Sequence, residues 1–356
     1  MNRVLAEVYG NPSSTHREGA AARAEVERAR ARVAALVNAA PGELVFTGSA
    51  TEANNTALGV ARPGDHVVTT AVEHPSVDEP LASLEERGVA VTRVPVDADG
   101  RVAPVDFQAA FRPETSLASA IWANNETGVV QPVAELAAVA RARGARFHVD
   151  ATQALGKLPV DVRAVGADFL AGSAHKFNGP KGAGFLVVRE GGMTPLLRGG
   201  PQERRRRGGT ENLAGIAGLG AAAELAATGL AERAAHSARL RDRLWDGIAA
   251  KVPRVRRNGS AEHVLPNTLN VEFEDAAGEV LLEALDLEGV AVSAGAACAS
   301  GSIEPSHVLV AMGRTAAQAR GSLRFSVGWG TREQDVDRVL AILPDLVARV
   351  RDAVSP

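Results

Sequence analysis

The chain has 356 residues, of which 46% are hydrophobic, and its formal net charge is -3 at pH 7. This length allows two domains with a large core, and the balanced charge argues against a nucleic-acid-binding domain, which would be clearly basic. No apolar run reaches the roughly 18 residues of a membrane span, and the first residues lack the apolar core of a signal peptide. We therefore expect a cytoplasmic protein without nucleic-acid or membrane partners.

The first two thirds of the chain alternate short apolar strands with helices, which favours a mostly parallel sheet covered by helices on both faces. Ser14 or Thr15 is placed to cap the first long helix. A Gly-rich segment follows the sixth strand, and the seventh should turn back along the sheet. The predicted strands are 43–46, 66–70, 90–95, 117–122, 145–149, 167–171 and 185–188. Of the predicted helices, the first ends near residue 38, the second begins near residue 50, and two others span about 76–87 and 133–143.

The last third of the chain predicts a smaller α+β unit. Long Ala/Leu-rich helices end near residue 250, and the Pro, Arg, Asn and Gly residues of 252–260 indicate a linker. We therefore predict a large domain over 15–250 and a small domain made of 1–14 and 251–356. Within the small domain we expect strands at 268–273, 290–292 and 321–327, and helices at 278–287 and from about 332.

Polar side chains follow several of the predicted strands. Glu73-His74-Pro75, Asn124 to Gly128, Asp150 to Gln153 and Ser173 to Lys176 all stand at strand exits. In open α/β sheets ligands bind at the carboxyl ends of the strands. An amine, a carboxylate and an imidazole at one such edge suit a pyridoxal phosphate site, where the amine forms a Schiff base and the carboxylate pairs with the ring nitrogen.

The use of basic residues singles out Lys176. The chain has thirty-five Arg but only four Lys, at positions 157, 176, 181 and 251. A surface charge rarely needs to be Lys, whereas only a primary amine forms an imine. Lys176 is the best placed of the four, although a surface lysine in a glycine-rich turn would have the same spacing.

Two further segments indicate chemistry. Small residues before the helix at about residue 50 leave backbone N–H groups free, and such groups together with the helix dipole bind phosphate. Cys298 is the only cysteine, which excludes an internal disulfide and a Cys-rich metal site, and no metal is expected. It stands in a run of small residues without an apolar anchor, and this favours an exposed, reactive thiol over a buried structural one.

Taken together, these segments resemble the cysteine desulfurases of the iron–sulfur-cluster and nitrogen-fixation type, in the class V aminotransferase group of pyridoxal phosphate enzymes. The resemblance covers nearly the whole chain. It implies a fold type I large domain with a seven-stranded, mostly parallel sheet. The motifs that carry it are Gly10-Asn11-Pro12, Ala50-Thr51-Glu52-Ala53-Asn54-Asn55, Glu73-His74-Pro75, Asn124-Asn125-Glu126, His148-Val149-Asp150-Ala151, Ser173-Ala174-His175-Lys176, Gly209-Thr210-Glu211-Asn212 and the Cys298 loop before Glu304-Pro305-Ser306-His307.

The resemblance also implies a role for each site residue. Lys176 would hold the cofactor and move the Cα proton, His74 would stack on the ring, and Cys298 would take the sulfur as a persulfide. The substrate would be L-cysteine and the products alanine and sulfur for an acceptor protein such as an iron–sulfur scaffold. The remaining implied residues are Ala50, Thr51, Asn125, Asp150, Gln153, Ser173, His175 and, from the partner of a homodimer, Thr210 for the cofactor, with Asn11, Asn125 and Arg324 for the substrate.

Relatives in this family carry an Ala-Thr-Thr-Pro segment before the Gly-Asn-Pro region, and this sequence lacks it. Two alternatives to the desulfurase stay open, and the missing segment bears on the second. One is a lyase of the same fold that acts on selenocysteine or cysteine sulfinate and could work without Cys298. The other is a pyridoxal-phosphate-binding partner protein without turnover.

Overall fold

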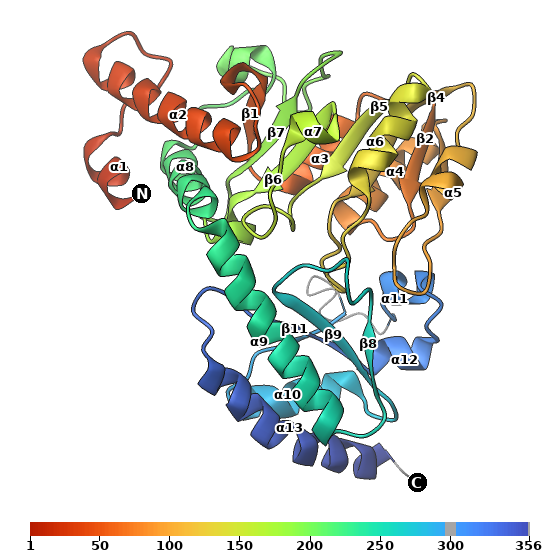
Figure 1. Ribbon diagram of the computed structural model, residues 1–356. Coiled ribbons are helices and arrows are strands. Elements are labelled where there is room, and N and C mark those ends of the chain that lie inside the picture. The colour runs from red at the N-terminus through yellow and green to blue at the C-terminus, as the bar shows by residue number, and fades with distance from the viewer. Residues whose placement is uncertain (296–303, 355–356) are drawn as a thin grey trace. The chain divides into compact units, whose positions relative to one another are not determined.

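The computed structural model describes residues 1–295 and 304–354, and the chain divides into two compact units (Figure 1). Unit 1 consists of Met1–Val94, Pro104–Trp122 and Pro132–Leu230. Unit 2 consists of Pro95–Ala103, Ala123–Gln131 and Ala231–Pro356.

This division differs from the predicted one in three places. The first fourteen residues belong to unit 1, and the chain passes into unit 2 at residue 231 instead of near residue 251. Two loops of the first half, Pro95–Ala103 and Ala123–Gln131, also belong to unit 2. The second of these loops contains Asn125, so this candidate residue lies outside the unit that its sequence position suggests.

Unit 1 is built on a seven-stranded sheet with the order β1-β7-β6-β5-β4-β2-β3. Only β7 runs against its neighbours, β1 and β6, and the other pairs are parallel. The predicted mostly parallel sheet with a returning last strand is confirmed. The strands are β1 Leu44–Thr47, β2 His66–Thr70, β3 Ala90–Val94, β4 Thr115–Ile121, β5 Arg146–Asp150, β6 Phe169–Ser173 and β7 Gly184–Val188.

Helices cover this sheet because their apolar faces need burial. Helices α3 and α4 pack over the sheet through a buried cluster that includes Ala57, Leu81 and Leu117, and α6 contacts β4 and β5 (Figure 1). The helices of unit 1 are α1 Asn2–Glu7, α2 Arg17–Leu36, α3 Ala50–Leu58, α4 Pro75–Glu86, α5 Pro104–Ala109, α6 Val133–Ala142, α7 Val162–Val165 and α8 Leu213–Ala227, with 3₁₀ turns η1 Pro41–Glu43, η2 Ala174–Phe177 and η3 Gln202–Arg205.

The cap of α2 corrects the sequence prediction. Neither Ser14 nor Thr15 caps this helix. The N-cap is His16, whose ring nitrogen Nδ1 accepts the backbone N–H of Gly19 at 3.2 Å. An imidazole nitrogen thus accepts the hydrogen bond that a Ser or Thr hydroxyl oxygen usually accepts at an N-cap.

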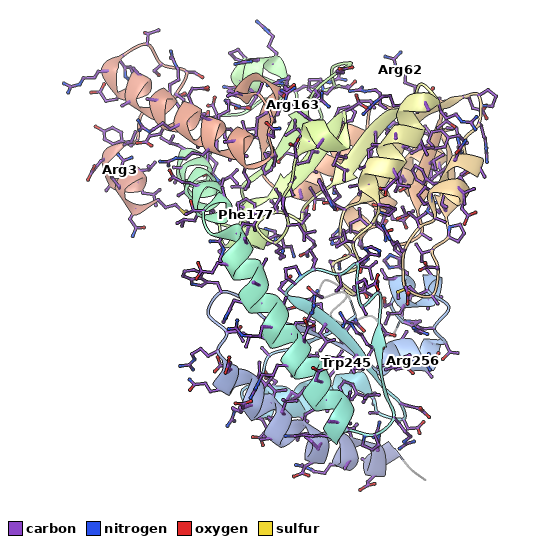
Figure 2. All side chains as sticks on the ribbon, in the orientation of Figure 1. Arg3, Arg62, Arg163, Phe177, Trp245 and Arg256 are labelled. Carbon is purple, nitrogen blue, oxygen red and sulfur yellow. The ribbon has the colours of Figure 1, made fainter. Side chains whose placement is uncertain are left out.

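Unit 2 contains an antiparallel sheet with the order β10-β11-β9-β8. Its core joins Leu244 of α9 and Leu343 of α13 to strand residues such as Val271, and Trp245 packs against this cluster (Figure 2). The elements are α9 Leu230–Lys251, β8 Val255–Asn258, β9 Thr268–Phe273, α10 Gly278–Leu287, β10 Ser293–Ala294, α11 His307–Ala311, α12 Ala316–Arg320, β11 Ser322–Ser326 and α13 Glu333–Val354.

Two expectations for this unit are wrong. The segment expected to be a linker, 252–260, contains strand β8. Its polar residues still form a strand because their backbone pairs with β9. The strand expected at 290–292 lies instead at Ser293–Ala294, where it pairs with β11. Val290 and Val292 still pack against the core, which is why their apolar character resembled that of a strand.

Among the described residues, no single helix is long and apolar enough to cross a membrane. Only α8 and α9 taken together, as a bent pair, have the required length and composition.

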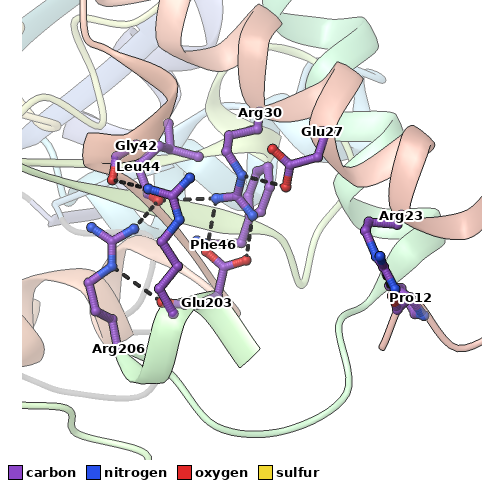
Figure 3. Close-up of polar contacts among 10 residues, drawn as sticks. Pro12, Arg23, Glu27, Arg30, Gly42, Leu44, Phe46, Glu203 and Arg206 are labelled. Carbon is purple, nitrogen blue, oxygen red and sulfur yellow. Dashed lines mark hydrogen bonds and ion pairs between the residues drawn. The ribbon is translucent and has the colours of Figure 1, made fainter. Parts of the chain in front are cut away.

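A buried ion pair in unit 1 fixes the loop that precedes α8 (Figure 3). Arg30 of α2 donates to both carboxylate oxygens of Glu203, at 2.7 and 3.0 Å, and the two side chains are only 8% and 2% exposed. Glu203 also accepts the backbone N–H of Phe46 at 2.9 Å. These bonds hold Glu203 and the next two residues in the left-handed region, with φ values of 46°, 58° and 66°, which costs roughly 1–2 kcal/mol per residue.

We predict that Glu203→Gln lowers the free energy of unfolding by about 3–5 kcal/mol, because it removes the buried partner of the Arg30 charge, which the exposed Glu27 carboxylate compensates only weakly. Glu27→Gln is the matched control, since Glu27 also pairs with Arg30 but is 54% exposed, and it should cost about 0–1 kcal/mol. Urea unfolding followed by circular dichroism measures both. Equal losses in the two variants would contradict a stabilising role for the buried pair.

Candidate active site

The candidate residues of unit 1 gather at one edge of the sheet. Strands β5 and β6 are parallel neighbours, and Asp150 ends the first while Ser173 ends the second. Lys176 follows directly in η2. Strands β1 and β2 run in the same direction, so the starts of α3 and α4, with Thr51 and His74, stand at the same edge. The topology therefore brings together the side chains that the sequence places at strand exits.

The start of α3 has the form of an anion-binding turn. Ser49 caps the helix by accepting the N–H of Glu52 at 3.2 Å, and Ala50 and Thr51 form the first turn. Strand β7 passes very close to this turn: a Cβ at Gly184 would lie 2.6 Å from the carbonyl carbon of Ser49. Glycine at position 184 therefore leaves room for the backbone that would cradle a phosphate.

The 3₁₀ turn of Lys176 is held by a second lysine. The amine of Lys157 donates to the carbonyl oxygen of Lys176 at 3.2 Å, and to the backbone and side-chain oxygens of Gln153 at 2.9 and 3.2 Å. Lys157 thus fixes both the main chain at the candidate Schiff-base lysine and the side chain of Gln153. The turn ends at Asn178, which adopts a left-handed φ of 65°.

His175 lies in a positive environment but is disposed to be neutral. Burial lowers the pKa of His175, and the charges of Lys176, Lys181 and Lys157 lower it further. Its Nδ1 lies 2.9 Å from the hydroxyl oxygen of Ser173. While this hydrogen bond persists, the neutral pair offers an anion one donor, which is Nε2–H of His175 if Ser173 donates to Nδ1, or the Ser173 hydroxyl if Nδ1–H donates to it.

Asp150 and His74 are both fixed by hydrogen bonds. The Asp150 carboxylate is 3% exposed and accepts the N–H of Thr152 and the amide N–H of Asn54, both at 2.9 Å. His74 is the N-cap of α4, and its Nδ1 accepts the N–H of Ser76 at 3.0 Å. A negative charge and an imidazole thus stand in set orientations at the sheet edge.

Thr210 lies on the exposed loop that the Arg30–Glu203 pair anchors. Arg207 of this loop forms an ion pair of 3.0 Å with Glu52 in the first turn of α3. The same carboxylate accepts the N–H of Gly48 at 2.7 Å. The loop is therefore attached to the turn beside Thr51.

Unit 2 holds the candidate carboxylate-binding residues. Arg324 of β11 donates to the carbonyl oxygen of Asn125 at 2.6 Å and to the hydroxyl oxygen of Ser293 at 3.1 Å. Asn124 shapes the turn, since its side-chain oxygen accepts the N–H groups of Glu126 and Thr127 at 2.8 and 3.0 Å. The structure thus brings Arg324 and Asn125 together, although 199 residues separate them in the sequence.

Two candidates remain, and the structure describes only one of them. Asn11 is exposed in unit 1, and its side-chain oxygen accepts the N–H of Ser13 at 2.9 Å. Cys298 lies outside the described residues.

Sequence reasoning named no role for four side chains that hold the site: Asn54, Ser76, Ser119 and Lys157. Lys157 is one of only four lysines, and this scarcity was a usable signal. Asn54 stands within a motif quoted above, but the spacing does not show which of two adjacent asparagines turns inward. Ser76 and Ser119 carry no signal in the sequence, since buried serines are common in helices and strands of small residues.

Three comparisons place this geometry among known proteins. Residues 1–339 match the family described as aminotransferase class-V. A cysteine desulfurase of Cereibacter sphaeroides is 47% identical, with 100% of this chain and 93% of that protein covered. A solved NifS-like protein aligns with a TM-score of 0.91 and 35% identity over 98% of this chain and 94% of that one. A structure described as SspA in complex with cysteine aligns with a TM-score of 0.81 and 33% identity over 92% and 93%.

Glu73, next to His74, gives a test of the electrostatics at this edge. Its side chain accepts the hydroxyl of Thr70 at 2.6 Å and the N–H of Ile121 at 2.9 Å. Burial raises the pKa of Glu73 to about 7, partly opposed by these hydrogen bonds. The folded protein therefore binds a proton that the unfolded chain releases above its ordinary pKa of 4.5, so stability should fall as the pH rises from 4.5 to about 7.

We predict that Glu73→Gln removes this dependence, because the amide keeps an acceptor oxygen and has no proton to lose. The variant should match the wild type in thermal stability at pH 5. At pH 8 its free energy of unfolding should exceed that of the wild type by roughly 3 kcal/mol or less, because that is the proton-linked loss of stability expected for such a pKa shift. Thermal unfolding at both pH values measures this, and a difference that is the same at pH 5 and pH 8 would contradict it.

Proposed function

Because the chain belongs to the aminotransferase class-V family, and within it to the cysteine desulfurases, we propose that it takes sulfur from L-cysteine with pyridoxal phosphate as cofactor. The observation that carries this proposal is the convergence of Lys176, Asp150 and His74 at one sheet edge beside the turn at Ala50. An amine, a carboxylate, an imidazole and an anion-binding turn are the groups that such a cofactor requires.

The residues present fit this cofactor. The backbone at Ala50 and the side chains of Thr51, Ser173 and His175 would hold its phosphate, in the space that Gly184 leaves beside Ser49. Asp150 would pair with the ring nitrogen, and Gln153, held by Lys157, would hydrogen-bond the ring hydroxyl. When bound, pyridoxal phosphate supplies an aldehyde that captures an amine and a ring that accepts the electron pair released at Cα.

The chain's own groups would then move protons. The Nζ of Lys176 would hold the cofactor at rest and would take the proton from Cα of the substrate. His74, whose Nδ1 accepts the N–H of Ser76, would use its Nε2 to hold or move a proton. The Asp150 carboxylate keeps the ring nitrogen protonated, because burial without such a partner would favour the neutral ring.

Recognition of the substrate carboxylate falls to Arg324, Asn125 and Asn11. The Arg324 side chain is only partly buried and is oriented by the Asn125 carbonyl and by Ser293. A guanidinium held in this way presents a planar pair of donors that matches a carboxylate.

Sulfur transfer would use Cys298. Its thiolate attacks Sγ of the substrate, so that an S–S bond forms while the Cβ–Sγ bond breaks and its electron pair stays on the carbon side. Protonation of that carbon, together with return to Cα of the proton that Lys176 took, gives alanine, and Cys298 keeps the sulfur as a persulfide. A thiol acceptor then removes this sulfur, and a scaffold protein for iron–sulfur clusters is the kind of acceptor we propose. A homodimer would add Thr210 of each chain to the phosphate site of its partner.

The direct test is the release of alanine and sulfide from L-cysteine in the presence of a thiol reductant. We expect equal amounts of both products from the wild type and from Lys251→Ala, a control lysine in α9 outside the site. Lys176→Ala and Cys298→Ala should lose at least a hundredfold in rate.

The two alternative functions, a lyase of the same fold and a partner protein without turnover, give different results in this test. Turnover that persists in Cys298→Ala would favour a lyase acting on selenocysteine or cysteine sulfinate. Cofactor binding without either product in the wild type would favour a partner protein without turnover.

We further predict that Arg324→Lys raises the KM for L-cysteine about tenfold or more, with a smaller change in kcat. Lysine keeps the charge but loses the paired donors. Arg320→Lys, at the exposed end of α12, is the matched control and should leave KM within about twofold. Steady-state kinetics measure both. A fall in kcat at unchanged KM would contradict a role of Arg324 in holding the substrate carboxylate.

A further inference from the structure

Asn54, in the middle of α3, is fully buried and joins two residues of the candidate site. Its amide nitrogen donates to the carboxylate of Asp150 and to the hydroxyl oxygen of Ser76, both at 2.9 Å. Its side-chain oxygen lies 3.1 Å from Nε2 of His148. A buried amide with all its polar atoms bonded to side chains is held in one orientation, and it orients its partners in turn.

The direction of each hydrogen bond around Asn54 follows from its neighbours. The Asn54 oxygen can only accept, so Nε2 of His148 carries a proton, and Nδ1 of His148 accepts the hydroxyl of Ser119 at 2.8 Å. Burial lowers the pKa of His148 to about 4, so this ring stays neutral near pH 7. A chain of donors therefore runs from Ser119 through His148 and Asn54 to Asp150.

The Asn54 amide also determines which ring nitrogen of His74 carries the proton. The Ser76 hydroxyl accepts from Asn54, so its own proton is free to go to Nδ1 of His74, 2.8 Å away. The backbone N–H of Ser76 donates to the same nitrogen at 3.0 Å. With two donors directed at Nδ1, the neutral ring of His74 must carry its proton on Nε2.

We propose that Asn54 is the positioning residue that orients both Asp150 and His74 for the cofactor, by directing one branched chain of hydrogen bonds. This inference rests on the proposed pyridoxal phosphate site. The chemistry of the position requires an amide. Aspartate would set a second carboxylate against Asp150, and alanine would leave His148, Ser76 and Asp150 each short of a partner.

The titratable groups that act on Asp150 are Glu73, whose pKa burial raises to about 7, and His148, which is neutral near pH 7. Without Asn54 the Asp150 carboxylate keeps the Thr152 N–H but loses the bond to its other oxygen, so it would be held less firmly toward the ring nitrogen and the ring would lose part of its positive charge. A less positive ring makes the imine nitrogen formed with Lys176 more basic. The pH at which the absorption of the bound cofactor changes should therefore rise.

The experiment compares Asn54→Ala with Asn55→Ala in the full-length protein. Asn55 is the adjacent residue of the same helix, and its side chain donates only to the backbone oxygen of Thr51 among the bonds observed. For each protein, pyridoxal phosphate is titrated into the cofactor-free form to obtain Kd. The absorption of the loaded protein is followed from pH 6 to 10, and the melting temperature of the cofactor-free form is recorded.

We expect Asn54→Ala to bind the cofactor about tenfold more weakly, the loss of one hydrogen bond to a charged group, and to shift the absorption midpoint upward by about half a pH unit or more. Asn55→Ala should stay within about twofold in Kd and show no such shift. Asn54→Ser keeps a small polar group, so its Kd and absorption midpoint should lie between those of the wild type and Asn54→Ala. It replaces the alanine variant in the test if that variant does not fold.

An Asn54 variant that melts at a lower temperature but matches Asn55→Ala in Kd and absorption midpoint would overturn the inference, since Asn54 would then only stabilise the fold. The outcome for the proposed function is separate. A wild-type protein that shows no cofactor absorption, with no change in Lys176→Ala, would refute the cofactor site itself.

Discussion

The buried carboxylate of Asp150 is the constraint on which the site depends. Moving a carboxylate out of water costs several kcal/mol unless hydrogen bonds or an opposite charge compensate it. Here a backbone N–H and the Asn54 amide supply two of the bonds that the oxygens can accept. A protonated ring nitrogen is the opposite charge that the proposed cofactor would add. The elements around Asp150 are arranged to hold this one charge in place.

Parallel strands make that arrangement possible. Because β4, β5 and β6 end at the same edge, residues more than twenty positions apart meet there without long loops. Helix α3 then crosses β5, β6 and β7, and this brings Asn54 over the end of β5. Small residues at the turns, of which Gly184 is the clearest, let backbone segments approach closely enough for their N–H groups to face a common ligand.

The sequence predicted much of this and missed the rest for identifiable reasons. The strand exits at His74, Asp150 and Lys176 were visible because a polar group directly after an apolar run is conspicuous. The inward orientation of Asn54 was not, since either of two adjacent helical asparagines could face the sheet. Hydrophobic periodicity could not show that the loop Ala123–Gln131 belongs to unit 2, because that assignment depends on contacts with residues far away in the sequence. The roles assigned to the site residues stay predictions, Cys298 among them.

The distribution of basic residues adds a final argument about the anion site. Three of the four lysines, Lys157, Lys176 and Lys181, act electrostatically on His175. Arginine supplies almost all the other positive charge, as in the Arg30–Glu203 pair, where a planar guanidinium matches a carboxylate. The lysine charges would attract a phosphate to the turn at Ala50, while the neutral pair of Ser173 and His175 supplies a directed donor. Charge thus brings the anion to the site, and neutral hydrogen bonds fix its orientation.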